Sequence, residues 1–150
     1  MAATPSTRRF DDRNIRWQAL GDFEHLEVTL LDVDEENNIV DLMVKFAPNE
    51  KIFLHRHLAL TNTLVVDGEH IIYEADGSAV KDVRPVGKYT SSPAGDAHLE
   101  GGGADGAIVH YSVRGDSDAL FDVLNDDMSV AATLRTADFK AVLEGQKQAA

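Results

Sequence analysis

The chain of 150 residues contains no cysteine and only four prolines and one tryptophan. Without cysteine it forms no disulfide and offers no thiolate, so His, Asp, Glu or water must hold any bound metal. It also lacks an apolar run as long as a membrane span, and Met1–Arg9 lacks the apolar core of a secretory signal. These absences predict a cytoplasmic protein without a membrane partner.

Positive charge is scarce as well. Lys and Arg number 14 against 26 Asp and Glu, which gives a formal net charge of −12. Nucleic acids and anionic membranes require a basic surface, so we expect neither as a partner. The hydrophobic fraction of 43% is sufficient for a packed core. This length predicts one domain over residues 1–150, with a flexible start at 1–12.

Short segments rich in β-branched and apolar residues alternate with turn signals through most of the chain, which is typical of a sandwich or barrel. Asp67-Gly68 predicts a two-residue hairpin turn, and 136–146 is expected to form a helix with Thr136 as its N-cap. The predicted fold is therefore all-β, with a barrel over about residues 25–123 and a short C-terminal helix. The expected strands are Ile15–Leu20, Leu26–Val33, Ile39–Phe46, Ile52–His57, Thr63–Val66, Glu69–Tyr73, Val80–Val83, Ala107–Val113 and Ala119–Val123.

Three histidines form the main candidate site. His55 and His57 are two residues apart, and alternate residues of a strand point to the same side. About forty residues later a Pro-x-Gly turn at Pro93 precedes His98. A histidine from a second strand can complete a set of nitrogen ligands, and imidazole suits zinc, copper, iron and nickel. The pattern predicts one mononuclear metal site held by these three residues.

The same residues resemble the two motifs of the cupins, which are small double-stranded β-helix (jelly-roll) barrels. The first motif is G-x5-H-x-H-x3,4-E-x6-G, and the residues in its positions are Asn49, His55, His57, Thr61 and Gly68. The second is G-x5-P-x-G-x2-H-x3-N, and the residues in its positions are Gly87, Pro93, Gly95, His98 and Gly102. The resemblance implies a cupin barrel with a metal inside it.

The main departure from the family pattern is Thr61, which replaces the metal-binding glutamate and is not expected to be a ligand. Glu100 lies two residues after His98, so a regular strand would point both side chains inward. Glu100 would then ligate the metal, act as a base or orient a histidine N–H. Alternatively, the following run Gly101–Gly103 ends the strand and turns Glu100 outward. The sequence leaves these alternatives open.

A three-histidine site resembles that of cupin dioxygenases that cleave β-diketones such as acetylacetone. This resemblance implies an Fe(II) enzyme, with zinc or nickel as other possible divalent ions, that binds a small enolate between apolar walls and uses O₂ to cleave a carbon–carbon bond. The alternatives are a redox-neutral isomerase or lyase and a non-catalytic ligand-binding cupin. Because cupin-like barrels have open edge strands, we also expect a homodimer.

Overall fold

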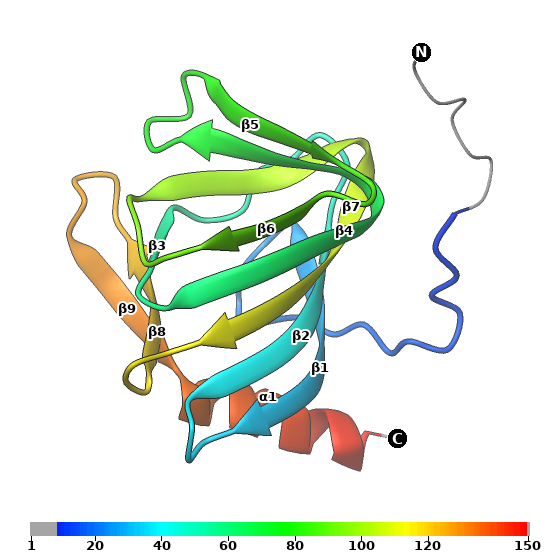
Figure 1. Ribbon diagram of the computed structural model, residues 1–150, viewed down its shortest axis with the longest axis vertical. Helices are drawn as coiled ribbons and strands as arrows, with labels where there is room; N and C mark the ends of the chain where they lie inside the picture. The colour runs from blue at the N-terminus through cyan, green and yellow to red at the C-terminus, as the bar shows by residue number, and fades with distance from the viewer. Residues whose placement is uncertain (1–8, 150) are drawn as a thin grey trace.

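One curled antiparallel sheet and a single helix account for the regular structure of residues 9–149, the part of the chain that this computed structural model describes (Figure 1). The elements are β1 (Leu26–Asp34), β2 (Ile39–Phe46), β3 (His55–His57), β4 (Leu60–Glu74), β5 (Val80–Pro85), β6 (Tyr89–Ser92), β7 (His98–Arg114), β8 (Ala119–Leu124), β9 (Val130–Arg135) and α1 (Thr136–Gln148). The prediction of an all-β barrel with a C-terminal helix is confirmed.

The longest strand, β7, joins the parts of the sheet. Along the path β1-β2-β7-β3-β8-β9 each strand pairs with its neighbours, and β4 pairs with β5, β6 and β7. The first residues of β7 pair with β3, its later residues pair with β2, and β4 follows it along almost its whole length. Segments that are distant in sequence therefore meet on β7, which explains why the predicted site residues can converge there.

The core follows from the alternation of side chains along the strands. Val28, Val40, Val109, Val113 and Leu120 are all fully buried, and each lies on a face that the curled sheet turns inward. The helix α1 packs its own apolar residues, Phe139 and Leu143, against this core.

The start of the helix differs by one residue from the prediction. Arg135, rather than Thr136, is the N-cap, and its backbone N–H donates to the Asp138 carboxylate at 2.7 Å. A carboxylate in the first turn of a helix is favourable because it accepts from otherwise unsatisfied N–H groups.

The predicted hairpin at Asp67-Gly68 is wrong. β4 continues through these residues, and its register against β7 shifts there twice, as in a β-bulge. Gly68 adopts a φ of +69° opposite Ala107, and a Cβ on Gly68 would overlap the Gly106 carbonyl oxygen. The hairpin turn lies instead between β4 and β5. The bulge reverses the alternation of inward and outward side chains along β4, so that His70 points inward.

Other boundaries also differ. The expected strand Ile15–Leu20 forms only an isolated bridge, in which Gln18 pairs with Val28 of β1. The strand predicted over Ile52–His57 is shorter and consists of β3 alone. The sequence did not predict β6 and β9, whose residues are largely exposed and so lack a buried apolar pattern.

The sequence predicted a flexible start over residues 1–12. Residues 1–8 lie outside the described part of the chain. In the segment 9–12, Arg9 donates two hydrogen bonds of 2.7 Å to Asp67. Within residues 9–149, no helix has the length and apolar character needed to cross a membrane. The homodimer and the cytoplasmic location stay predictions.

Candidate metal centre

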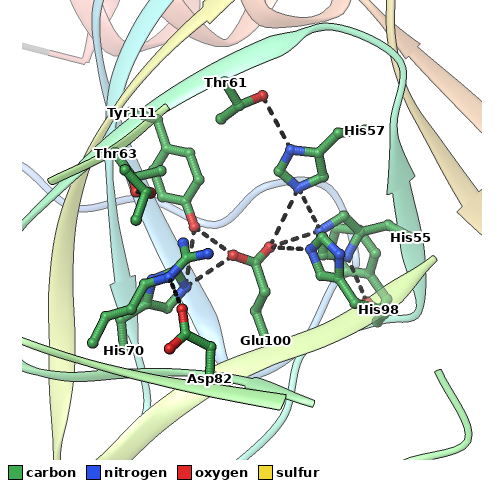
Figure 2. A network of polar contacts seen from close by, with 12 residues as sticks. His55, His57, Thr61, Thr63, His70, Asp82, His98, Glu100 and Tyr111 are labelled. Carbon is green, nitrogen blue, oxygen red and sulfur yellow. Dashed lines mark hydrogen bonds and ion pairs between the residues drawn. The ribbon is translucent and has the colours of Figure 1, made fainter. Parts of the chain in front are cut away.

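Four potential metal ligands converge inside the curled sheet: His55, His57, His98 and Glu100 (Figure 2). Each offers one nitrogen or oxygen atom, and these four atoms all lie within 4.8 Å of one another. The strand pairing produces this arrangement, because His55 is directly opposite His98 between β3 and β7 and each strand contributes a second residue two positions away. The structure therefore brings together the three histidines that the sequence predicted.

The glycine run after Glu100 does not end the strand. β7 continues through Gly101, and the Glu100 side chain is 3% exposed. The glycines are needed because the loop before β3 crosses β7 here, and a Cβ on Gly101 would overlap the carbonyl oxygen of Glu50. The structure thus settles the orientation of Glu100, which faces inward with His98.

The second nitrogen of each histidine ring has an acceptor that fixes the ring. His55 Nδ1 lies 2.9 Å from the Phe53 carbonyl oxygen, and His98 Nδ1 lies 3.3 Å from the Asp96 carbonyl oxygen. His57 Nδ1 lies 3.0 Å from Thr61 Oγ1, and this hydroxyl donates to the Ala59 carbonyl oxygen. Since carbonyl oxygens only accept, these contacts place the proton of each ring on Nδ1. The three Nε2 atoms are then left as acceptors.

These Nε2 atoms converge on another acceptor. Glu100 Oε2 lies 2.7 Å from His55 Nε2, 3.5 Å from His98 Nε2 and 3.7 Å from His57 Nε2. His55 Nε2 and His57 Nε2 are 3.1 Å apart, and His98 Nε2 is buried without a hydrogen-bond partner among the described residues. Buried acceptors that face one another are unfavourable unless a cation or proton lies between them. This donor set therefore fits a divalent metal.

The titration behaviour is consistent with that interpretation. Burial alone would lower the pKa of His55, but the hydrogen bond and charge of Glu100 outweigh it and raise this pKa above its ordinary value. Burial and repulsion from His55 and His98 lower the pKa of His57 to about 4. Burial opposes it, but the contacts with a protonated His55 at 2.7 Å and with His70 at 2.8 Å help to hold the Glu100 pKa well below its usual range. A proton on His55 Nε2 thus lies between this atom and Glu100 Oε2, where a cation is favourable.

The other oxygen of Glu100 has two further partners. His70 Nε2 and the Tyr111 hydroxyl each lie 2.8 Å from Glu100 Oε1 (Figure 2). A hairpin turn at Asp67-Gly68 would have left His70 exposed, but its side chain is fully buried. The bulge at Asp67-Gly68 turns His70 inward. Burial and the charge of Glu100 raise the Tyr111 pKa well above its usual range, so this phenol remains a donor.

The remaining candidate residues lie outside the cluster. Thr61 contacts His57 on the side of the ring that faces away from the other ligands. Arg56 faces away from the cluster, as its alternation with the histidines predicts, and pairs with Asp122 at 3.1 Å. His25 and His110 are not part of the cluster.

A pocket of about 400 Å³ opens onto the cluster and includes His57, His98 and Glu100 in its wall. A larger cavity of about 610 Å³ is formed around Arg9, Lys45 and Asp67, and none of the four ligand residues lines it. The smaller pocket is therefore the candidate substrate site.

The fold and the cluster together define a cupin. Residues 6–115 match the family described as the ChrR cupin-like domain, and the chain belongs to this family. No curated protein matches the sequence.

Several solved structures share the fold. An acetylacetone dioxygenase from Acinetobacter johnsonii has a TM-score of 0.73 at 10% identity, with 97% of this chain and 95% of that chain covered. A putative acetylacetone dioxygenase from Methylibium petroleiphilum has a TM-score of 0.73 at 13% identity, with 95% and 98% covered. A cupin-like protein of unknown function from Ralstonia eutropha has a TM-score of 0.72 at 20% identity, with 88% and 80% covered. At sequence identities this low, the similarity shows a shared fold and nothing further.

Proposed function

We propose that this cupin is a metal-dependent dioxygenase that binds a small β-diketone-like substrate as its enolate and uses O₂ to cleave a carbon–carbon bond. The observation that carries the proposal is the convergence of four ligand atoms beside a pocket large enough for a small molecule. The acetylacetone dioxygenase and the putative acetylacetone dioxygenase that share the fold support this choice of chemistry.

In this proposal His55, His57 and His98 bind one divalent ion through Nε2, and Glu100 Oε2 provides a fourth ligand. The carboxylate that the first cupin motif lacks at Thr61 thus comes from the second motif. Four protein ligands leave positions open on a six-coordinate ion for a chelating substrate. A divalent ion there, Fe(II) in our proposal, supplies Lewis acidity and the electrons for reaction with O₂.

The protein's own groups keep the substrate anion in place. With the charge of Glu100 included, a divalent ion retains one positive charge, which a monoanionic enolate neutralises. The protonated Tyr111 phenol and His70 hold Glu100 through Oε1, so the carboxylate cannot turn toward the substrate. A carboxylate fixed in this way maintains the charge and shape of the site.

A redox-neutral lyase or isomerase is the second candidate, and the contact between Tyr111 and Glu100 favours it. A buried phenol and carboxylate in contact at a metal site are suitable for moving a proton to and from a substrate. Such a reaction would require the metal only as a Lewis acid.

Anaerobic loading with Fe(II) distinguishes the two candidates. We expect acetylacetone to produce a charge-transfer band in the visible spectrum, and admission of air to start O₂ uptake with loss of the diketone. The His98→Ala variant, treated identically, should show neither signal. Substrate turnover that proceeds at the same rate without O₂ would refute the dioxygenase and support the lyase or isomerase.

A further inference from the structure

The 400 Å³ pocket beside the metal centre is polar, whereas the resemblance to diketone-cleaving cupins implied apolar walls; the apolar space that His55 and Glu100 also border is only about 50 Å³. Only Ile72 and Pro93 contribute larger apolar side chains to it. The other wall residues beside the ligands are Thr61, Thr63, Lys81, Asp82, Arg84, Thr90, Ser92, Gly95 and Asp96. A small apolar diketone would leave these hydroxyl and charged groups without partners, so the pocket's composition indicates a more polar substrate.

Strand register places Arg84 over the cluster. On β5, Arg84 lies opposite His70 of β4, and Asp82 lies opposite Ile72. Ile72 in turn lies opposite Glu100 of β7. Directly paired residues of antiparallel strands point to the same face of a sheet. Arg84 and Glu100 are therefore on the same inner face, and the Arg84 side chain is only 15% exposed.

Arg84 retains most of its hydrogen-bonding capacity. Within residues 9–149 its side chain makes one hydrogen bond, from Nε to Asp82 Oδ2 at 2.9 Å. A guanidinium group has five N–H donors, so its outer edge remains available to a ligand. Lys81 adds a second cation to the same wall. The wall also contains Asp82 and Asp96, so Arg84 and Lys81 are the two groups in it whose charge suits an anion.

Two hydroxyl groups complete this wall. Thr63 Oγ1 and Thr90 Oγ1 are hydrogen-bonded to each other across β4 and β6, with their residues in direct register. Only one hydroxyl of such a pair donates within it, so the other keeps a proton for a ligand.

We propose that the substrate of this metal site carries a carboxylate separate from its metal-binding oxygens, and that Arg84 binds this carboxylate with help from the Thr63–Thr90 pair. The planar guanidinium edge matches the two oxygens of a carboxylate. The substrate class is then a dioxo acid, not a neutral diketone. This inference rests on the proposed function, because the metal site must hold the diketone portion.

Two probes that differ at one end of the molecule test the inference. Both 2,4-pentanedione and 2,4-dioxopentanoate contain a β-diketone, but the second has a carboxylate where the first has a methyl group. Their dissociation constants are measured by calorimetry on Zn(II)-loaded protein, so that no O₂ chemistry interferes. We expect the wild type to bind the dioxo acid about 10- to 100-fold more tightly, the usual effect of a charge-assisted contact.

The Arg84→Gln variant should lose this preference by weakening the dioxo acid alone, and Arg84→Lys should retain part of it. A matched control is Arg13→Gln. Arg13 also pairs with an Asp two residues earlier, at 2.6 Å, but its side chain is 78% exposed and does not line the pocket. This control should bind both probes like the wild type. Zinc content and thermal melting establish that each variant is folded and loaded.

Equal affinity of the wild type for the two probes would overturn the inference, as would an Arg84→Gln variant that loses both equally. If Arg84→Gln does not fold, undiminished preference in Arg84→Lys overturns it as well, because lysine cannot reproduce the guanidinium fork. The proposed function is judged separately, by O₂ uptake with Fe(II). An Arg84-dependent preference without O₂ uptake supports the carboxylate site and refutes only the dioxygenase.

Discussion

The two oxygens of Glu100 face two different environments within one buried cluster. Around Oε1 the protein provides donors, with His70 Nε2 and the Tyr111 hydroxyl both at 2.8 Å. Around Oε2 it provides three Nε2 atoms, whose rings carry their protons on the opposite nitrogen. The two donors satisfy Oε1 as the protein stands, whereas the Oε2 side places acceptors against an acceptor and is satisfied only with a cation.

This difference separates a structural hydrogen-bond network from a metal site. Buried polar atoms are almost always paired in folded proteins, and Glu100 Oε1 follows that rule, although His70 Nδ1 behind it is buried without a partner among the described residues. The Oε2 side departs from it at His98 Nε2, which is buried and unpartnered among the described residues. Variants that alter each side separately, compared with one that alters both, test whether the two sides have these different roles.

Removal of a ligand from the acceptor side should have the largest effect. We expect His98→Ala to lose metal almost completely, because the three remaining ligand atoms no longer enclose an ion. Elemental analysis after loading and dialysis should give one ion per wild-type chain and less than about a tenth of that for the variant. The free energy of unfolding of the metal-free variant should change little, since His98 Nε2 has no partner to lose. Full metal occupancy in His98→Ala would refute the ligand assignment.

Glu100→Gln alters both sides at once. The amide keeps the size of the side chain but removes the charge that the metal and the protonated His55 require. We expect metal affinity and turnover to fall by roughly 10- to 100-fold, as measured by competition with a metal-chelating dye and by steady-state kinetics. Asp122→Asn provides a control for carboxylate loss, because Asp122 pairs with Arg56 away from the ligands. Wild-type metal affinity in Glu100→Gln would exclude Glu100 as a ligand.

A smaller loss of metal affinity is expected when a ligand histidine loses the acceptor that holds its Nδ1 atom. Thr61→Val keeps the shape of the side chain but removes the acceptor for His57 Nδ1. We expect Thr61→Val to bind metal roughly ten-fold more weakly than the wild type. Thr61→Ser should keep the wild-type affinity because serine retains the hydroxyl. The same dye competition measures both variants. If the Val and Ser variants bind metal equally well, Thr61 does not orient His57.

The smallest effect is predicted on the donor side. Tyr111→Phe removes one of two donors to Glu100 Oε1, and His70 still holds that oxygen. We expect metal affinity to change no more than a few-fold and the free energy of unfolding to fall by about 1 kcal/mol, as followed by urea denaturation of the metal-free protein. A loss of affinity as large as that of Glu100→Gln would show that the two sides are not separable.

The acceptor side could be predicted from the sequence and the donor side could not. His55, His57 and His98 lie in short motifs with fixed spacing, so local alternation was sufficient to group them. His70 depends on the bulge at Asp67-Gly68, which forms because β4 meets Gly106 of β7, a contact between distant segments. A dipeptide typical of hairpins gave no indication of that contact.

For the fold, too, only features that local sequence specifies could be predicted. The strand Ile39–Phe46 was predicted to the residue because an apolar segment between two turns specifies it locally. Glu100 was ambiguous because a glycine run either ends a strand or admits a crossing loop, and only the position of Glu50 decides between them. The polar wall around Arg84 depends on the register of β5 against β4, which the sequence does not reveal.

In the metal-free protein, a proton on His55 would occupy the position that the metal takes in the proposed site. Because the folded protein raises the His55 pKa above 6.5, the stability gained from this proton is present below pH 6.5 and is lost as the pH rises through the raised value. A metal must displace the proton, so its affinity should increase with pH until that value is passed. His57, with a pKa of about 4, is already neutral and should not contribute.

The most direct measurement is a calorimetric titration of the metal-free wild type with Zn(II) at pH 6.5, in two buffers of different ionisation enthalpy. The difference in observed heat, corrected for proton and buffer binding by the metal itself, gives the protons released by the protein. We predict one ion per chain and the release of about one proton. Binding without proton release would contradict the claim that a proton on His55 holds the metal's position, and the same binding in His98→Ala would contradict the claim that the acceptor side of Glu100 is a metal site.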